Sequence, residues 1–337
     1  MNVLSLFDGI SCGRIALERA GIKVDKYYAS EVDKYAIQVS KKNWPDILHI
    51  WSVKDISYGG WVLIANDLSL LAHIYDWWSW EKVDIDMIIW WSPCQDLSIA
   101  KKDWKWLKGE KSWLFFEYVR LLEEVKPKYF LLENVASMKK EDREEITRII
   151  SEIYPDSQCY LINSALVSAQ NRKRLYWTNI PGVTIPEDKW IYLKDIIEDK
   201  VDEKYEVQWV AMRNRWEWKK PEYNNIEKAN AMTTVRTDSM ISIRVWQFNS
   251  GGQGDRVYSI EWKSVSLSAN GGWRGAKTGL YEVSPIIRKL TPIECERLQT
   301  IQDDYTEWIS NTQRYKTIWN GWTVDVVAHI FSYIKNN

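Results

Sequence analysis

The sequence predicts an α/β protein, in which helices cover both faces of a parallel sheet and a smaller, loop-rich lobe is attached. Three observations predict this fold. The first 150 residues alternate short apolar runs with amphipathic stretches, which is the order of strand–helix–strand units. The chain has 337 residues, and a single core stops growing at roughly 250–300 residues, so two lobes are expected. Between 183 and 285 the runs are short and are separated by Gly, Asn, Ser and Asp, as in loops.

Six elements are predicted in the first 150 residues. Each strand is a short apolar run, each helix has apolar residues at helical spacing, and Gly21 supplies a helix stop signal. In parallel sheets ligands bind at the carboxyl ends of the strands. The predicted elements are, in order, a strand at 3–7, a helix at 13–20, a strand at 27–30, a helix at 33–42, and strands at 83–89 and 129–132.

The C-terminal residues are predicted to form a helix that packs back onto the first lobe. Apolar residues near the end of the chain share one helix face, at Val324, Val327, Ala328, Phe331 and Ile334. We therefore expect one domain built from 1–182 together with 286–337, and a second domain at 183–285.

Composition argues against membrane and metal-binding classes. The longest apolar stretch, 61–75, is interrupted by polar residues and is too short to span a bilayer, and the N-terminus has no charged leader or cleavage site. The four cysteines lie far apart without a CxxC pair, so we expect no metal site and no disulfide framework. We expect a soluble, cytoplasmic protein. Its formal net charge is −1, but basic residues outnumber acidic ones between 201 and 290, where a polyanion would be met locally.

A glycine turn follows the first predicted strand. Asp8 and Gly9 end the strand, and Glu31 ends the next one, 22 residues after Gly9. Such a turn lets the backbone approach a nucleotide-like ligand, while the acid can bind ribose hydroxyls. Taken alone this motif is weak, since many α/β proteins have a glycine turn for packing reasons only.

Three further motifs carry reactive or charged groups. Cys94 follows a buried strand and a proline and precedes a lysine-rich loop, which favours an exposed thiolate over a buried cysteine. Glu133 is at another strand end, where a carboxylate is commonly just a helix cap. Arg172 and Arg174 are alternate residues of a predicted strand, so they point the same way and could together meet a phosphate or a base edge.

In this order, these motifs resemble those of the DNA cytosine-5 methyltransferase family. The resemblance covers nearly the whole chain, and six segments in the family's order make it specific. The matching segments are 7–13, 93–95, 133–135, 170–174, 288–299 and 320–324. The resemblance implies the Rossmann-like sheet of a methyltransferase that uses S-adenosyl-L-methionine, with helices on both faces. It also implies that 183–285 is the target-recognition domain and that 1–182 with 286–337 is the catalytic, cofactor-binding domain.

The resemblance also implies residue roles. Cys94 would add to C6 of a flipped cytosine, Glu133 would hold N3 and the exocyclic amine, and Arg172 with Arg174 would steady the base. The implied cofactor-binding residues are Phe7, Asp8, Gly9, Glu31 and Asn320, with Asp55 in place of an acid that the family has near position 52. The implied DNA-binding residues are Gln95, Lys101, Lys105, Arg236 and Arg244. The implied partners are double-stranded DNA and a cognate restriction endonuclease, for a monomeric enzyme.

Tryptophan is unusually frequent. The chain has 22 Trp but only 15 Gly, against roughly 24 Gly at an average usage of about 7%. Several Trp stand where the family has Gly: Trp51, Trp90, Trp91, Trp113 and Trp319. Our hypothesis is that the gene comes from an organism that reads UGA as glycine, and that UGA codons are translated as tryptophan in this sequence. The alternative is a naturally Trp-rich protein whose aromatic side chains pack or stack on bases.

Two other functions stay open. A tRNA cytosine-5 methyltransferase can share this framework, and it would methylate tRNA but not duplex DNA. A catalytically inactive DNA-binding homologue would result if the tryptophans at glycine positions are literal, and it would bind DNA without binding the cofactor.

Overall fold

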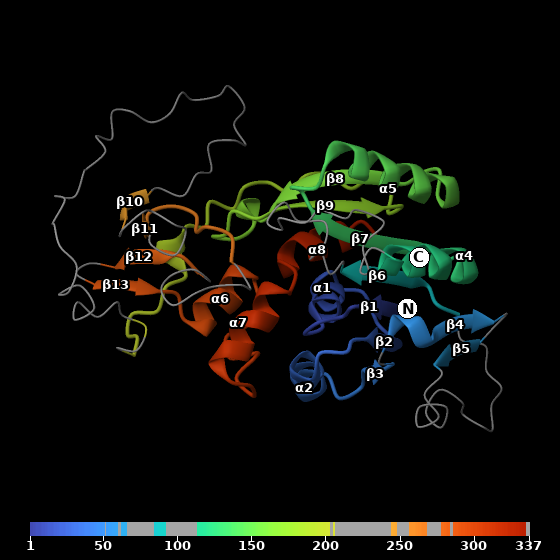
Figure 1. Cartoon of the computed structure of the whole chain (residues 1–337), viewed down its shortest axis with the longest axis horizontal. Helices are drawn as coiled ribbons and strands as arrows, with labels where there is room; N and C mark the ends of the chain where they lie inside the picture. Colours follow the sequence, from blue (N-terminus) through green and yellow to red (C-terminus); the bar gives the residue numbers. More distant parts are fainter. Residues whose placement is uncertain are drawn as a thin grey trace. The chain divides into compact units, whose positions relative to one another are not determined.

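The protein folds into two compact units. The computed structural model describes residues 1–50, 52–59, 62–65, 84–91, 113–202, 205, 244–247, 256–267, 278–283 and 286–334. The first unit comprises 1–162, 173–186 and 324–337, and the second comprises 163–172 and 187–323. In Figure 1 the first unit contains the labels β1 to β9, and the second contains β10 to β13.

A seven-stranded sheet forms the first unit, in the order β3-β2-β1-β6-β7-β9-β8. Its strands are β1 (Asn2–Leu6), β2 (Lys26–Ser30), β3 (Leu48–His49), β6 (Met87–Trp91), β7 (Tyr129–Val135), β8 (Gln158–Asn163) and β9 (Lys173–Thr178). The neighbours from β3 to β7 pair in parallel. The parallel pairing predicted for the strands of the first 150 residues is confirmed, and β9, which follows them in the chain, runs antiparallel to β7.

The strand order reverses beside β1. The chain steps outward from β1 to β2 and β3, then returns to the other side of β1 with β6 and continues to β7. At such a reversal the loops that leave the two central strands diverge, and ligands of open α/β sheets bind in the crevice they leave. The carboxyl ends of β1 and β6 are therefore the expected binding edge.

Helices flank this sheet (Figure 1). They are α1 (Cys12–Arg19), α2 (Lys34–Asn43), α4 (Trp113–Val125), α5 (Lys140–Ile153) and α8 (Val324–Phe331). The predicted helices at 13–20 and 33–42 are confirmed to within a residue or two. α8 packs against α1, so the C-terminal helix does return to the first unit.

Both faces of the sheet are buried. Alternate residues such as Leu4 and Leu6 join a core with Tyr118 of α4 and Ile150 of α5. Val3 directly precedes Leu4 in sequence and is also fully buried, on the opposite face. Strands covered on both sides read as continuous apolar runs, which is why the sequence pattern predicted them.

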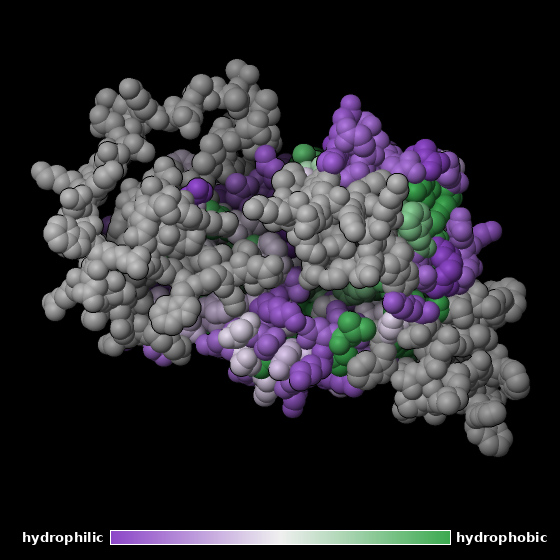
Figure 2. All heavy atoms as spheres, viewed as in Figure 1, coloured by the Kyte–Doolittle hydropathy of each residue, from purple (hydrophilic) through white to green (hydrophobic). Residues whose placement is uncertain are grey.

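The outer face of α5 is polar. Arg148 forms ion pairs with Glu145 at 2.8 Å and Glu152 at 2.5 Å, while Ile146 and Ile150 point to the core. Figure 2 shows hydrophilic side chains gathered over this helix. The amphipathic pattern thus fixes which side of α5 meets the sheet.

The second unit contains a four-stranded sheet in the order β10-β11-β12-β13 and two helices. The elements are β10 (Arg244–Gln247), β11 (Arg256–Ser259), β12 (Leu280–Val283), β13 (Ile286–Lys289), α6 (Pro292–Leu298) and α7 (Asn311–Trp319). Short strands were expected here. Tyr258, Tyr281, Cys295 and Ile318 meet in its core. Residues 286–323 cluster with this unit, and the functional division into catalytic and recognition domains stays a prediction.

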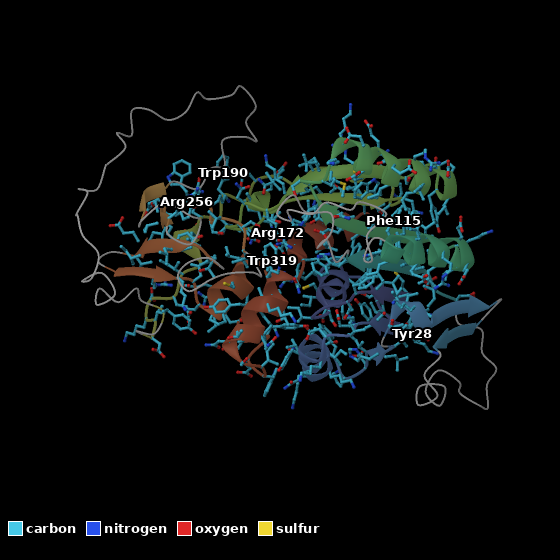
Figure 3. The ribbon with its side chains drawn as sticks, in the orientation of Figure 1. Tyr28, Phe115, Arg172, Trp190, Arg256 and Trp319 are labelled. Atoms are coloured by element: carbon cyan, nitrogen blue, oxygen red, sulfur yellow. The ribbon has the colours of Figure 1, made fainter. Side chains whose placement is uncertain are left out.

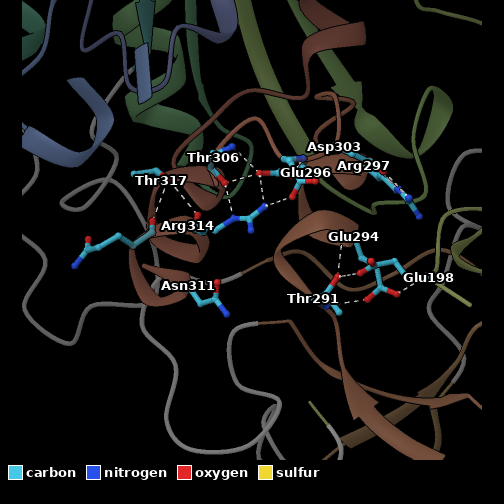
Figure 4. A network of polar contacts seen from close by, with 12 residues as sticks. Glu198, Thr291, Glu294, Glu296, Arg297, Asp303, Thr306, Asn311, Arg314 and Thr317 are labelled. Atoms are coloured by element: carbon cyan, nitrogen blue, oxygen red, sulfur yellow. Dashed lines mark hydrogen bonds and ion pairs between the residues drawn. The ribbon is translucent and has the colours of Figure 1, made fainter. Parts of the chain in front are cut away.

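A buried polar network joins α6 to α7 (Figure 4). Glu296 is fully buried and accepts hydrogen bonds from Arg314 Nη2 at 3.0 Å and from the Thr306 main-chain N–H at 2.9 Å. At the start of α6, Glu294 pairs with Arg288 at 2.7 Å and completes the cap of the helix. Arg288, Glu294 and Glu296 belong to the motif at 288–299, so this motif stabilises the second unit.

Candidate functional site

The turn after β1 has unusual backbone geometry. Phe7 and Gly9 have φ angles of 58° and 60°, in the left-handed region. A Cβ added at Gly9 would meet no atom of the described residues within 4 Å, and glycine is favoured there by its backbone conformation. The space beside Gly9 leaves its main chain accessible to a ligand.

Asp8 holds this turn from the inside. Its carboxylate accepts hydrogen bonds from the hydroxyls of Ser5 at 2.6 Å, Tyr27 at 2.7 Å and Ser11 at 2.5 Å. Burial raises the pKa of Asp8 to about 6, against the lowering effect of these hydroxyl donors. The three hydroxyl partners were not predicted, since Ser5 and Tyr27 come from two different strands and carry no motif. The predicted cofactor-binding role of Asp8 is untested, and its carboxylate points into the fold.

Glu31 links the ends of β1 and β2. Its Oε2 accepts the Gly9 N–H at 2.8 Å, and its Oε1 accepts the N–H groups of Val32 and Asp33 at 2.7 and 2.8 Å. An ionised carboxylate offers about four acceptor positions. One position therefore remains for a further donor such as a ribose hydroxyl.

Two other predicted cofactor residues lie at helix ends. Asp55 is the last residue of a short 3-10 helix, Val53–Asp55, which Ser52 caps by accepting the Lys54 N–H. Asn320 caps the C-terminal end of α7, and its N–H donates to the Lys316 carbonyl at 3.2 Å. Their roles stay predictions.

A buried ion pair is at the predicted glutamate motif. Glu133 Oε1 lies 2.7 Å from Arg174 Nε, with side-chain exposures of 2% and 10%. Glu133 lies inside β7 rather than after it, because β7 extends to Val135. Strand pairing sets Glu133 opposite Trp91, the last residue of β6. The sequence did not predict the pairing of these two charges, and it placed the end of the strand too early.

Arg172 behaves differently from Arg174. β9 begins at Lys173, so the expectation that both arginines share a strand was wrong, and Arg172 belongs to the second unit. Its guanidinium lies 5.2 Å from the Trp319 ring centroid, and its Nη2 donates to the carbonyls of Trp319 and Gly321, each at 3.3 Å. Figure 3 shows Arg172 beside Trp319. Arg172 is thereby fixed to the end of α7, next to Asn320.

Several predicted residues lie outside the described part of the chain. They are Cys94, Gln95, Lys101, Lys105 and Arg236. Arg244 is the first residue of β10. The described cysteines are poor nucleophiles: Cys12 is buried, and burial raises the pKa of Cys159 to about 12 and that of Cys295 far above its ordinary value.

Two of the tryptophans at family glycine positions, Trp90 and Trp91, lie at the end of β6. Trp90 is packed among Phe7, Phe115 and Tyr118, and the indole N–H groups of Trp90 and Trp91 are buried without a hydrogen-bond partner. An unpaired buried donor costs about 1–3 kcal/mol.

The backbone at Trp190 independently favours the hypothesis that tryptophan replaces glycine in this chain. Trp190 has a φ of 56°, and because it is 63% exposed, packing of its side chain does not account for this conformation (Figure 3). A bulky residue in the left-handed region is an outlier, whereas glycine is at ease there. An unpaired indole N–H does not by itself distinguish a tryptophan that replaces glycine from a native one, because Trp322, which matches a family aromatic, also has one. Trp177, which also matches one, donates to Thr147 Oγ1 at 2.8 Å.

Among the described residues, no helix is long and apolar enough to cross a bilayer. The same residues contain no cluster of three or more His, Cys, Asp or Glu side chains that could hold a metal ion.

A mixed α/β sheet with a glycine turn and an acid at adjacent strand ends is typical of α/β proteins that bind a nucleoside, although the motif alone does not establish this class. The family model for C-5 cytosine-specific DNA methylase matches residues 1–336. The chain belongs to this family, and it is a DNA cytosine-5 methyltransferase that uses S-adenosylmethionine as methyl donor.

Characterised relatives match over nearly the whole chain. The type II methyltransferase M.HhaI of Haemophilus parahaemolyticus is 27% identical over 349 residues, covering 100% of this chain and 94% of that protein. The orphan methyltransferase M.SPRI of Bacillus phage SPR is 24% identical, covering 98% and 96%. The crystal structure of the S. pombe Dnmt2 methyltransferase has a TM-score of 0.65 at 15% identity, covering 98% of this chain and 97% of that one. This last likeness concerns the fold.

Proposed function

We propose that this chain methylates C5 of a cytosine flipped out of duplex DNA, with Cys94 as the nucleophile. The observation that supports Cys94 most is the pairing of Trp91 with Glu133. Cys94 follows Trp91 by three residues, so chain length keeps it within about 11 Å of that position. Cys94 thus follows β6 in the chain, and Glu133 lies in β7, the strand that pairs with β6.

The protein groups act on the base in sequence. The Cys94 thiolate adds to C6, which makes C5 nucleophilic and divides one hard step into easier ones. Glu133 binds N3 and the exocyclic amine and favours protonation at N3 as negative charge develops. Arg174 neutralises Glu133 in the free protein, and Arg172 and Arg174 steady the base. After methyl transfer the C5 proton is lost and the Cys94 sulfur leaves C6.

The residues present fit S-adenosylmethionine, which supplies an electrophilic methyl group. The open space at Gly9 admits the ligand's close approach, and the remaining acceptor position on Glu31 suits a ribose hydroxyl. Phe7, Gly9, Glu31, Asp55 and Asn320 would hold it, while Asp8 fixes the turn that presents them.

We assign the DNA contacts to the predicted recognition domain at 183–285 and to the residues that follow β6 in the chain. Gln95, Lys101 and Lys105 would act near the flipped base, and Arg236 and Arg244 within 183–285 would read the target. We further propose a monomeric, cytoplasmic enzyme. Whether a restriction endonuclease accompanies it is a separate question, since the relatives include both type II and orphan methyltransferases.

The test uses methyl-labelled S-adenosylmethionine with unmethylated duplex DNA, and tRNA as a second substrate. Label in cytosine C5 of DNA is the expected result, and label in tRNA alone would overturn the DNA assignment. Cys94→Ser should abolish turnover and leave cofactor binding intact, measured by calorimetry. Cys159→Ser is the matched control and should keep full activity. A fully active Cys94→Ser protein would remove the central assignment.

A second candidate is a catalytically inactive DNA-binding protein. The position of Trp90 and Trp91 favours it, because both stand where the family has glycine and lie in β6, the strand that leads to Cys94. DNA binding without cofactor binding is the outcome that would select it.

A further inference from the structure

Gln170 is a buried amide with nothing to bind. It is 0% exposed, and both its Nε2 and Oε1 atoms are buried without a hydrogen-bond partner. A primary amide has two donor hydrogens and a carbonyl acceptor, and leaving such a group unpaired inside a protein costs about 1–3 kcal/mol. The motif at 170–174 contains it, but neither the predicted roles nor the described contacts use its side chain.

The main chain around Gln170 is firmly held, so the amide cannot easily turn away. Ser264 brackets it, donating from its N–H to the Ala169 carbonyl at 2.7 Å and accepting the Asn171 N–H at 3.1 Å. The Arg172 N–H donates to Asn163 Oδ1 at 3.0 Å. The segment is therefore fixed on both sides while its central amide is unsatisfied.

We propose that Gln170 is a positioning residue whose amide pairs with a base of the bound DNA. The inference rests on the proposed function, which puts Arg172, two residues away, against the flipped base. Both the donor and the acceptor of Gln170 are free. A base edge presents a donor beside an acceptor, whereas a phosphate presents acceptors only. Because the amide is buried in the free protein, this pair forms only after DNA binding moves the side chains that cover the amide, while the main chain of 169–172 keeps its hydrogen bonds.

The test compares three variants by thermal unfolding and by DNA binding, neither of which needs methyl transfer. Gln170→Met keeps the length and removes the polar atoms, so it should unfold at the same temperature or higher and bind target DNA roughly tenfold more weakly. Gln302→Met, at an exposed position, is the control and should change neither. Gln170→Glu should bind weakly at neutral pH and regain affinity, relative to the unsubstituted chain, as pH falls and the carboxyl gains a proton to donate.

Duplexes with an abasic site separate two sources of the base. If the Gln170→Met defect disappears when the target cytosine is abasic, the partner is the target base, and if it persists the partner is a neighbouring base. Undiminished DNA binding by Gln170→Met would overturn the proposal, since the amide would then hold only a water molecule. A fall of several degrees in its unfolding temperature would also overturn it, by revealing a partner in the free fold. DNA binding without any methylation would instead contradict the proposed function and would leave the contact between Gln170 and a base unaffected.

Discussion

At the scale of single residues, Asp8 makes a testable contribution to stability. Its pKa is about 6 in the folded protein against an ordinary value of 3.8, because burial disfavours the ionised form. A raised pKa means that the folded state binds this proton more tightly. The contribution is therefore fully present below about pH 4 and is lost as pH rises through 6.

Asp8→Asn removes this titration. We expect the free energy of unfolding of the unsubstituted chain, relative to that of Asp8→Asn, to fall by about 2 kcal/mol between pH 4 and pH 7. Urea unfolding at several pH values measures it. A difference that stays constant across this range would show that Asp8 titrates alike in the folded and unfolded states.

The tryptophans give a second residue-scale prediction. Trp190→Gly should stabilise the chain by about 1 kcal/mol, because it relieves a left-handed backbone and removes little packing. Trp44→Gly is the control and should destabilise, since Trp44 has a φ of −134° and stacks on Arg14 at 4.5 Å. If Trp190→Gly destabilises as much as the control does, the tryptophan is native at that position.

The coding hypothesis makes a further prediction about activity. Glycine restored at Trp51, Trp90, Trp91, Trp113 and Trp319 should raise methylation of duplex DNA over that of the unsubstituted chain. Sequencing the codons decides the origin, and UGG at Trp90, Trp91 and Trp319 would exclude UGA read as glycine.

At the scale of elements, the contact between α6 and α7 depends on one buried charge pair. Arg314→Met leaves Glu296 buried and ionised without its cation, which should cost about 3–5 kcal/mol in the stability of the second unit. Arg148→Met breaks the exposed pairs on α5 and should lower the free energy of unfolding far less than Arg314→Met does. If both variants lose the same free energy of unfolding, burial does not determine how much an ion pair contributes to stability.

Elements were predictable where a local pattern determines them. The first two helices and the strand before each were found from apolar spacing, Gly21 and Asp33, because these signals act within a few residues. The antiparallel direction of β9 was not predictable, since an apolar run reads the same in either direction. The inward turn of Asp8 was missed for a related reason: two of its three partners lie in strands that only the folded sheet brings together.

At the scale of the whole molecule, a net charge of −1 must be reconciled with a polyanionic substrate. Binding then depends on local basic groups that meet phosphates, and each neutralised phosphate releases counterions. Lys101 and Lys105 were chosen from the sequence as such groups. Lys101→Gln and Lys105→Gln should each reduce the slope of log affinity against log salt by about 0.9, with similar losses on every DNA sequence. Lys23→Gln, at an exposed lysine of the first unit, should leave the slope unchanged. Unchanged slopes in all three variants would move the phosphate contacts to the basic segment at 201–290, where Arg236 and Arg244 become the next residues to replace.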